Sequence, residues 1–104
     1  MPENMVTRVR LEVLVDAPLA PKLVQLSKQA GITGHTLMRT VSGEGRGGAW
    51  SEDLVSGATS KLIFLAVANE ERSNAFIRLV KPLLDSHGLL ILRSPVDVVR
   101  PERF

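Results

Sequence analysis

Cysteine and tyrosine are absent from the chain, and its aromatic residues are limited to three phenylalanines and one tryptophan among 104 residues. Without cysteine, disulfides, thiolate nucleophiles and cysteine-ligated metal sites are excluded. Long hydrophobic runs are also missing, since the longest, residues 62–68, is far shorter than the roughly 20 residues that span a bilayer. We therefore expect an aliphatic core and no membrane-spanning segment.

Charge of one sign is not concentrated anywhere in the chain. Thirteen lysines and arginines stand against eleven acidic residues, which gives a net charge of +2. This balance argues against a surface for nucleic acid, which needs clustered basic residues, but well-placed arginines can still bind small anions. Residues 1–10 show no apolar run behind a basic start, so we expect no secretory signal and a cytoplasmic protein. The length predicts one domain, residues 1–104.

Hydrophobic periodicity predicts the secondary structure. Residues 6–15 alternate between apolar and polar side chains, which is typical of a strand with one buried face. A helix is expected to open at Asp16, with Pro18 in its first turn, and to stop at Gly31. Residues 35–41 and 61–68 read as the second and third strands.

The C-terminal half continues with a second helix capped by Asn69. Pro82 lies inside that helix and predicts a kink or an early end, because proline cannot donate the helical hydrogen bond. Residues 86–88 are expected to form a turn, residues 89–92 a fourth strand, and residues 95–104 a tail. The order βαββαβ predicts an α+β, ferredoxin-like fold, an antiparallel sheet with both helices on one face.

The third and fourth strands are apolar on both faces, although the helices can cover only one. A second apolar face needs a partner, or it leaves a large exposed hydrophobic patch. In so short a chain, a further copy of the same chain is the simplest partner. The pattern therefore predicts an oligomer.

Residues 42–57 read as a long mobile loop that begins with Ser42-Gly43-Glu44-Gly45-Arg46-Gly47-Gly48. Glycines let backbone N–H groups approach a phosphate, and an arginine adds a bidentate, charge-assisted contact. The segment is neither a Walker loop, because the Gly-Lys-Ser/Thr ending is missing, nor a dinucleotide fingerprint, because no helix follows. On this pattern alone, an ordinary flexible surface loop is the favoured interpretation.

Residues 30–37 together with residues 43–46 closely resemble the signature of PII-like signalling proteins, the nitrogen-regulatory PII superfamily. In that family a Gly-x-Thr on the second strand precedes a Gly-x-Gly-Arg opening of the flexible T-loop, here about 42–57. The likeness extends to the strand that starts at Lys61 and to residues 97–100. It implies a homotrimer that binds ADP, AMP or ATP in clefts between subunits and has no catalytic activity.

The resemblance also implies roles for individual residues. Gly34 and Thr36 would lie beside the adenine and ribose, and Arg100 of an adjacent subunit would add a cation. The residues expected around the phosphates are Gly43, Gly45, Arg46 and Gly47. His87 and Gly88 are further candidates for contact with the nucleotide, whereas the two histidines are too few for a paired metal site, so no metal is expected.

The chain departs from the family pattern in three places. One extra residue lies between Gly34 and Gly43, the T-loop has no tyrosine, and the Gly-rich loop that holds a phosphate-binding lysine in typical members is missing. A reduced phosphate site favours ADP or AMP. It also makes the chain similar to the short branch linked to inorganic carbon uptake and carboxysome gene clusters, which suggests bicarbonate as a second ligand at Ser42, Gly43 and Arg46.

Within the same resemblance, the T-loop would engage or release a partner, with a membrane bicarbonate transporter as one candidate. Trp50, Glu52 and Asp53 are the candidate partner contacts, although Trp50 could equally pack on its own subunit. Three other functions share the βαββαβ order. They are an acylphosphatase-like enzyme, an RNA-binding module, which needs stacking aromatics on the sheet, and a trimeric module like the divalent-cation-tolerance proteins.

Overall fold

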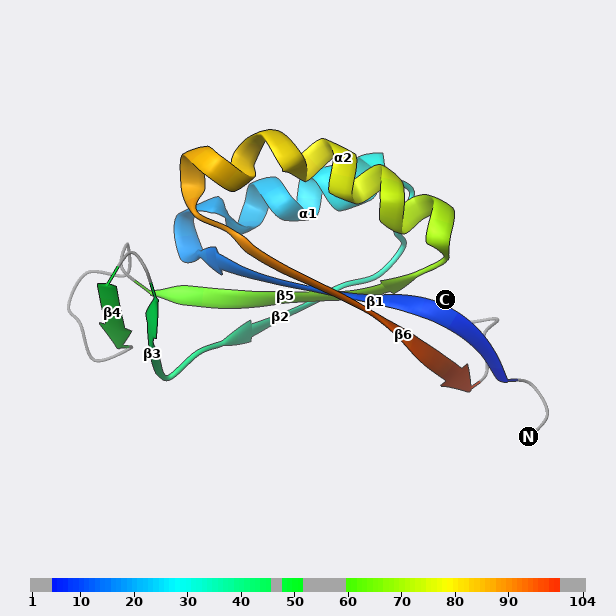
Figure 1. Ribbon diagram of the computed structural model, residues 1–104, viewed down its shortest axis with the longest axis horizontal. Helices are drawn as coiled ribbons and strands as arrows, with labels where there is room; N and C mark the ends of the chain where they lie inside the picture. The colour runs from blue at the N-terminus through cyan, green and yellow to red at the C-terminus, as the bar shows by residue number, and fades with distance from the viewer. Residues whose placement is uncertain (1–4, 46–47, 52–59, 100–104) are drawn as a thin grey trace.

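The computed structural model describes residues 5–45, 48–51 and 60–99, and it contains one main sheet with two helices on one side of it (Figure 1). The sheet order is β2-β5-β1-β6, and every neighbouring pair is antiparallel. Its strands are β1 (Met5–Asp16), β2 (Thr36–Arg39), β5 (Lys61–Ala68) and β6 (Leu90–Val99). This confirms the predicted ferredoxin-like fold.

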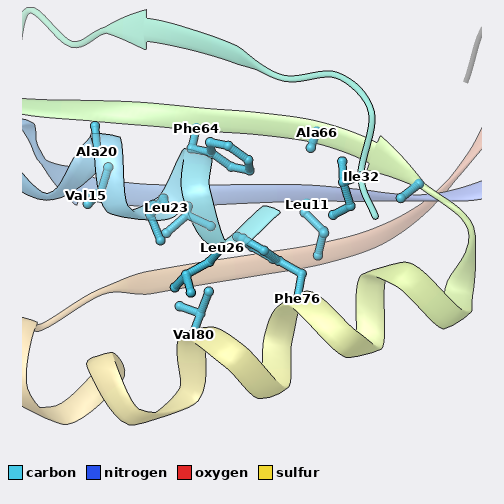
Figure 2. Close-up of a cluster of buried hydrophobic side chains, with 12 residues drawn as sticks. Leu11, Val15, Ala20, Leu23, Leu26, Ile32, Phe64, Ala66, Phe76 and Val80 are labelled. Atoms are coloured by element: carbon cyan, nitrogen blue, oxygen red, sulfur yellow. The ribbon is translucent and has the colours of Figure 1, made fainter. Parts of the chain in front are cut away.

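The core lies between this sheet and the helices α1 (Ala20–Gln29) and α2 (Glu70–His87). Alternation along β1 buries every second side chain against the helices, and β5 does the same from Phe64 onward. Figure 2 shows these side chains between the sheet and the helices. Phe64 and Phe76 are fully buried and their rings stack at 5.5 Å. The other buried core residues are aliphatic: Leu11, Val13, Val15, Ala20, Leu23, Leu26, Ile32, Ala66, Ala68 and Val80.

The ends of the helices follow the sequence signals, with two differences. The Asn69 side chain accepts a hydrogen bond from the backbone N–H of Arg72 at 2.8 Å, so the predicted cap of α2 is confirmed. Before α1, the single 3₁₀ turn η1 (Ala17–Leu19) holds the residues that were expected in the first α-helical turn.

An early end of α2 at Pro82 is wrong, because the helix runs through it to His87. The apolar residues around Pro82 pack on the core and offset the lost hydrogen bond. Residues 86 and 87 of the predicted turn are therefore the last part of the helix. Gly88 closes it in the left-handed conformation with φ 59°.

Two further segments are more ordered than the sequence suggests. β6 continues to Val99, so the tail does not begin at residue 95; Pro95 fits because β6 is an edge strand. The described part of the predicted loop is a hairpin, β3 (Ser42–Gly45) paired with β4 (Gly48–Ser51), rather than irregular chain. Glycines hide the alternation that would have indicated these strands. Residues 52–59 lie outside the described residues.

The sheet face opposite the helices is mostly apolar on β5 and β6, whereas β1 places the ion pair of Arg10 and Glu12 between those two strands. Cross-strand partners share a face, so Leu14 lies with Ile63 and Leu90 on this side. We define the open-face patch as Leu14, Met38, Ile63, Leu65, Val67, Leu90 and Leu92. Leu90 and Leu92 are 51% and 53% exposed in the single chain. The expectation that the strands are apolar on both faces is therefore confirmed.

Candidate nucleotide and anion site

The predicted adenine-side residues lie at the edge of the sheet. Gly34 precedes β2, and Thr36 opens it directly opposite Leu65. Because Leu65 alternates with the buried Phe64, Thr36 shares the open face. His35 takes the other side, where its ring stacks on Phe64 at 5.6 Å between centroids. This places His35 in a packing role and leaves Thr36 available at the edge.

The chain leaves β2 at Arg39 and enters the β3–β4 hairpin two residues later. The hairpin lies beyond the end of the sheet where β2 ends and β5 begins (Figure 1). The predicted anion residues Ser42, Gly43 and Gly45 all lie on β3. Arg46 and Gly47, between the paired Gly45 and Gly48, are outside the described residues. The structure therefore brings the described loop residues of the predicted site together on one short strand.

Trp50 packs on its own subunit. It lies opposite Gly43 in the hairpin, and a methyl group on Gly43 would overlap the Cζ2, Cη2 and Cε2 atoms of the indole. The indole Nε1–H donates to Thr40 Oγ1 at 2.9 Å, and this hydroxyl donates to the Lys61 carbonyl at 2.7 Å. The hairpin is thus tied to the end of β5 through one tryptophan and one threonine.

A lysine completes these contacts. Lys61 Nζ lies 5.3 Å from the centroid of the Trp50 ring and 2.6 Å from Asp16 Oδ1. A cation–π contact at a partly exposed site contributes about 0.5–1 kcal/mol, and a hydrogen bond about 1 kcal/mol. Together they favour this docked hairpin by a small multiple of the thermal energy. Neither Thr40 nor Lys61 could be assigned this role from the sequence, because the contacts join residues 10 and 21 positions apart.

Gly34 and Gly45 have no structural explanation among the residues that the structure describes. Neither has a positive φ, and a Cβ atom built at either would meet no atom within 4 Å. Gly43 differs, since its missing side chain makes room for Trp50. Both positions are among the predicted nucleotide contacts, and each is open on the side where a side chain would stand.

The remaining predicted contacts are distant within one chain. β6 lies at the opposite edge of the sheet from β2, three strand spacings or about 14 Å away, so His87 and Gly88, just before β6, are not beside Thr36. Thr36 lies level with Leu92 across the sheet, and Val99 is about 23 Å farther along β6. Arg100, like Glu52 and Asp53, lies outside the described residues.

One hollow surface of the described residues lies elsewhere. A cavity of about 340 Å³ lies beside the N-terminal end of α2 and is lined partly by Arg8, Glu70 and Arg93. Arg93 and Glu70 form an ion pair across it at 3.6 Å. None of the predicted site residues contributes to this cavity. Among the described residues, Thr36 and Val99 are too far apart to line one site within a single chain.

The fold, the Gly-x-Thr on β2 and the glycine-rich hairpin agree with a match over nearly the whole chain. The family model for nitrogen regulatory protein P-II matches residues 5–103. The chain belongs to the P-II family. This confirms the resemblance inferred from residues 30–37 and 43–46. Among curated proteins, no sequence match is found.

Solved structures of P-II-like proteins share the fold at low sequence identity. CPII from Thiomonas intermedia, bound to ADP, AMP and bicarbonate, is 20% identical with a TM-score of 0.88, covering 96% of this chain and 95% of that chain. A PII-like signaling protein from Thermus thermophilus is 19% identical with a TM-score of 0.85, covering 97% and 98%. The ATP complex of Bacillus subtilis GlnK is 15% identical with a TM-score of 0.61, covering 86% and 82%.

Family membership and side-chain placement together weaken the other βαββαβ functions. In an acylphosphatase-like enzyme, the connection after the first strand would cradle phosphate, but here it forms η1, which contains Pro18. An RNA-binding module needs aromatics on the open face. Phe64, the one aromatic residue of β5, points instead into the core.

Over the described part of the chain, no helix has the length and apolar character needed to cross a bilayer.

Proposed function

We propose that this P-II family protein is a homotrimeric sensor that binds adenine nucleotide in clefts between its subunits and acts through the T-loop rather than by catalysis. The family match and the nucleotide-bound relatives support this assignment. The open-face patch supports the oligomer, because its exposed leucines require cover. In this proposal the protein acts in the cytoplasm.

The main support for a cleft between subunits is the distance that separates the predicted contacts within one chain. Thr36 and the β3 glycines lie toward one end of the sheet, whereas Val99, the residue before Arg100, lies about 23 Å beyond the level of Thr36. One chain cannot place Arg100 beside its own Thr36 without a large change. A neighbouring copy can supply that arginine. The cleft then combines the edge of the open face and the hairpin of one subunit with the tail of its neighbour.

Bicarbonate is proposed as the second ligand, at Ser42, Gly43 and Arg46. CPII, which shares the fold, is seen with ADP, AMP and bicarbonate together. The glycine-rich β3 offers backbone N–H groups for a small anion, and Arg46 offers a planar guanidinium that matches its geometry. Occupation of this site would set the T-loop conformation and thereby control a partner, for which a bicarbonate transporter in inorganic carbon uptake is our candidate.

Calorimetric titration of the protein with ADP, AMP, ATP and sodium bicarbonate tests the proposal directly. We expect ADP and AMP to bind one molecule per chain and ATP to bind more weakly, because the Gly-rich phosphate loop before β6 is missing. ADP affinity should rise when bicarbonate is present. Absence of binding by all three nucleotides at millimolar concentration would contradict the proposed function.

The two unexplained glycines give a sharper test. Gly34→Ala and Gly45→Ala should leave the free energy of unfolding nearly unchanged, because each added methyl group meets no atom of the chain. ADP affinity should fall about tenfold, or about 1.4 kcal/mol, where that methyl group meets the nucleotide. Chemical denaturation and calorimetry measure the two effects separately. Full ADP affinity in both variants would remove these residues from the site.

A further inference from the structure

The side of Gly43 on which a side chain would stand is already occupied. The Trp50 ring fills the space where a side chain at position 43 would stand. Gly43 and Trp50 are both only partly buried, so this contact is at the surface and open to exchange with solvent. A ligand that approaches Gly43 closely from this side must therefore displace the indole.

Three contacts oppose that displacement. Thr40 accepts the indole hydrogen bond while donating to the Lys61 carbonyl, and Lys61 places its ammonium group over the ring. Asp16 holds the ammonium group from the other side at 2.6 Å. These residues come from β5, the end of β1 and the link after β2, so the hairpin is fastened to the sheet rather than merely folded on itself.

The geometry points to Trp50 as a built-in plug that competes with the ligand for Gly43. This inference rests on the proposed function, because it assumes that ligand binds at β3. In the docked state, Trp50 covers Gly43 and the hairpin is fastened through Thr40 and Lys61. In the ligand-bound state, the ring leaves, the Thr40 contact breaks, and the T-loop is free to change conformation. A ligand that binds only the open state shifts the balance between the two.

The docked state can be tested without any ligand, because Trp50 is the sole tryptophan. Its indole N–H gives one resolved signal, and its hydrogen exchange rate reports how often the ring leaves. Thr40→Val keeps the shape of the side chain but removes the hydroxyl, so exchange should accelerate about fivefold. Thr7→Val, which removes a hydroxyl bonded to Asp97 at the far end of β1, is the matched control and should change nothing.

A second variant addresses the contact with Gly43. Gly43→Ala should expel the ring, with a red shift of tryptophan emission and faster indole exchange like that of Thr40→Val. If indole exchange in the wild-type chain is already as fast as in a free peptide, or if both substitutions leave it unchanged, the plug does not exist. Circular dichroism confirms that each variant remains folded.

Competition is then measured by titrating ADP, with and without sodium bicarbonate, into the wild type, Thr40→Val and Thr7→Val. Opening the plug should tighten apparent ADP affinity by up to about fivefold in Thr40→Val only, and ADP should accelerate indole exchange in the wild type. Unchanged or weaker ADP affinity in Thr40→Val would contradict the proposed competition between Trp50 and the ligand. The proposed function would remain intact. Failure of every chain to bind ADP would instead reject the proposed function, and the ligand-free exchange would still decide whether the plug exists.

Discussion

Leu90→Glu should convert a trimer of about 34 kDa, three times the chain mass of 11.3 kDa, into single chains. Leu90 is 51% exposed in the single chain and lies beside Leu14 in the open-face patch. A glutamate there can remain solvated in a monomer, so the fold should persist. In a trimer it would put one carboxylate per subunit into an apolar interface at a cost of several kcal/mol each. Light scattering on a sizing column measures the mass.

The control for this experiment is Leu79→Glu. Leu79 is also an exposed leucine, at 37%, but it belongs to α2 on the side of the sheet opposite the patch. The variant should keep the trimer mass and a native circular dichroism spectrum. A monomeric wild type, or a Leu90→Glu variant that remains trimeric, would show that the open-face patch is not the interface. The intersubunit cleft would then lose its support.

The predicted interface and the predicted adenine contact share one face of the sheet. Thr36 lies opposite Leu65, a member of the open-face patch, so the predicted adenine contact borders the predicted interface. A subunit that docks on the patch therefore also approaches Thr36. In this arrangement, Leu90→Glu should abolish nucleotide binding together with the trimer, without touching a predicted ligand contact.

The fold could be predicted largely from the sequence because its strongest signals are local. β5 matches its predicted range, 61–68, since an unbroken apolar run between polar residues has few other interpretations. Helix α2 continues past Pro82 and strand β6 includes Pro95, because packing on the core and an edge position offset the lost hydrogen-bond donors. Such compensation depends on tertiary neighbours and is not visible in spacing.

The candidate site was less accessible to sequence reasoning. The resemblance to the P-II family places Gly34 beside the adenine and ribose and places Gly43 and Gly45 around the phosphates, and the structure distinguishes Gly43 from the other two. Gly43 makes room for Trp50, whereas no described residue lies near the place of a side chain at either of the other two. The fastening of Trp50 to Thr40 depends on how the hairpin folds back, which glycine-rich sequence does not specify.

Arg46→Ala should weaken ADP binding by about 1.5–3 kcal/mol, roughly 10- to 150-fold, because a guanidinium on phosphate makes charge-assisted, bidentate hydrogen bonds. This prediction rests on the sequence, in which Arg46 directly follows Gly45 of β3. Arg46→Lys keeps the charge but lacks the planar pair of donors. Its ADP affinity should therefore lie between that of the wild type and that of Arg46→Ala. Adenosine, which has no phosphate, should bind equally to both variants and the wild type.

The matched control is Arg78→Ala, which removes an exposed arginine from α2, on the helix-covered side of the sheet. It changes the net charge of the trimer by the same amount, so a general loss of attraction between the protein and an anion would appear in both variants. A loss confined to Arg46→Ala, and to nucleotides that carry phosphate, locates the guanidinium at the phosphate. Undiminished ADP affinity in Arg46→Ala would remove that assignment and leave the bound phosphate to the backbone of β3 and to the neighbouring tail.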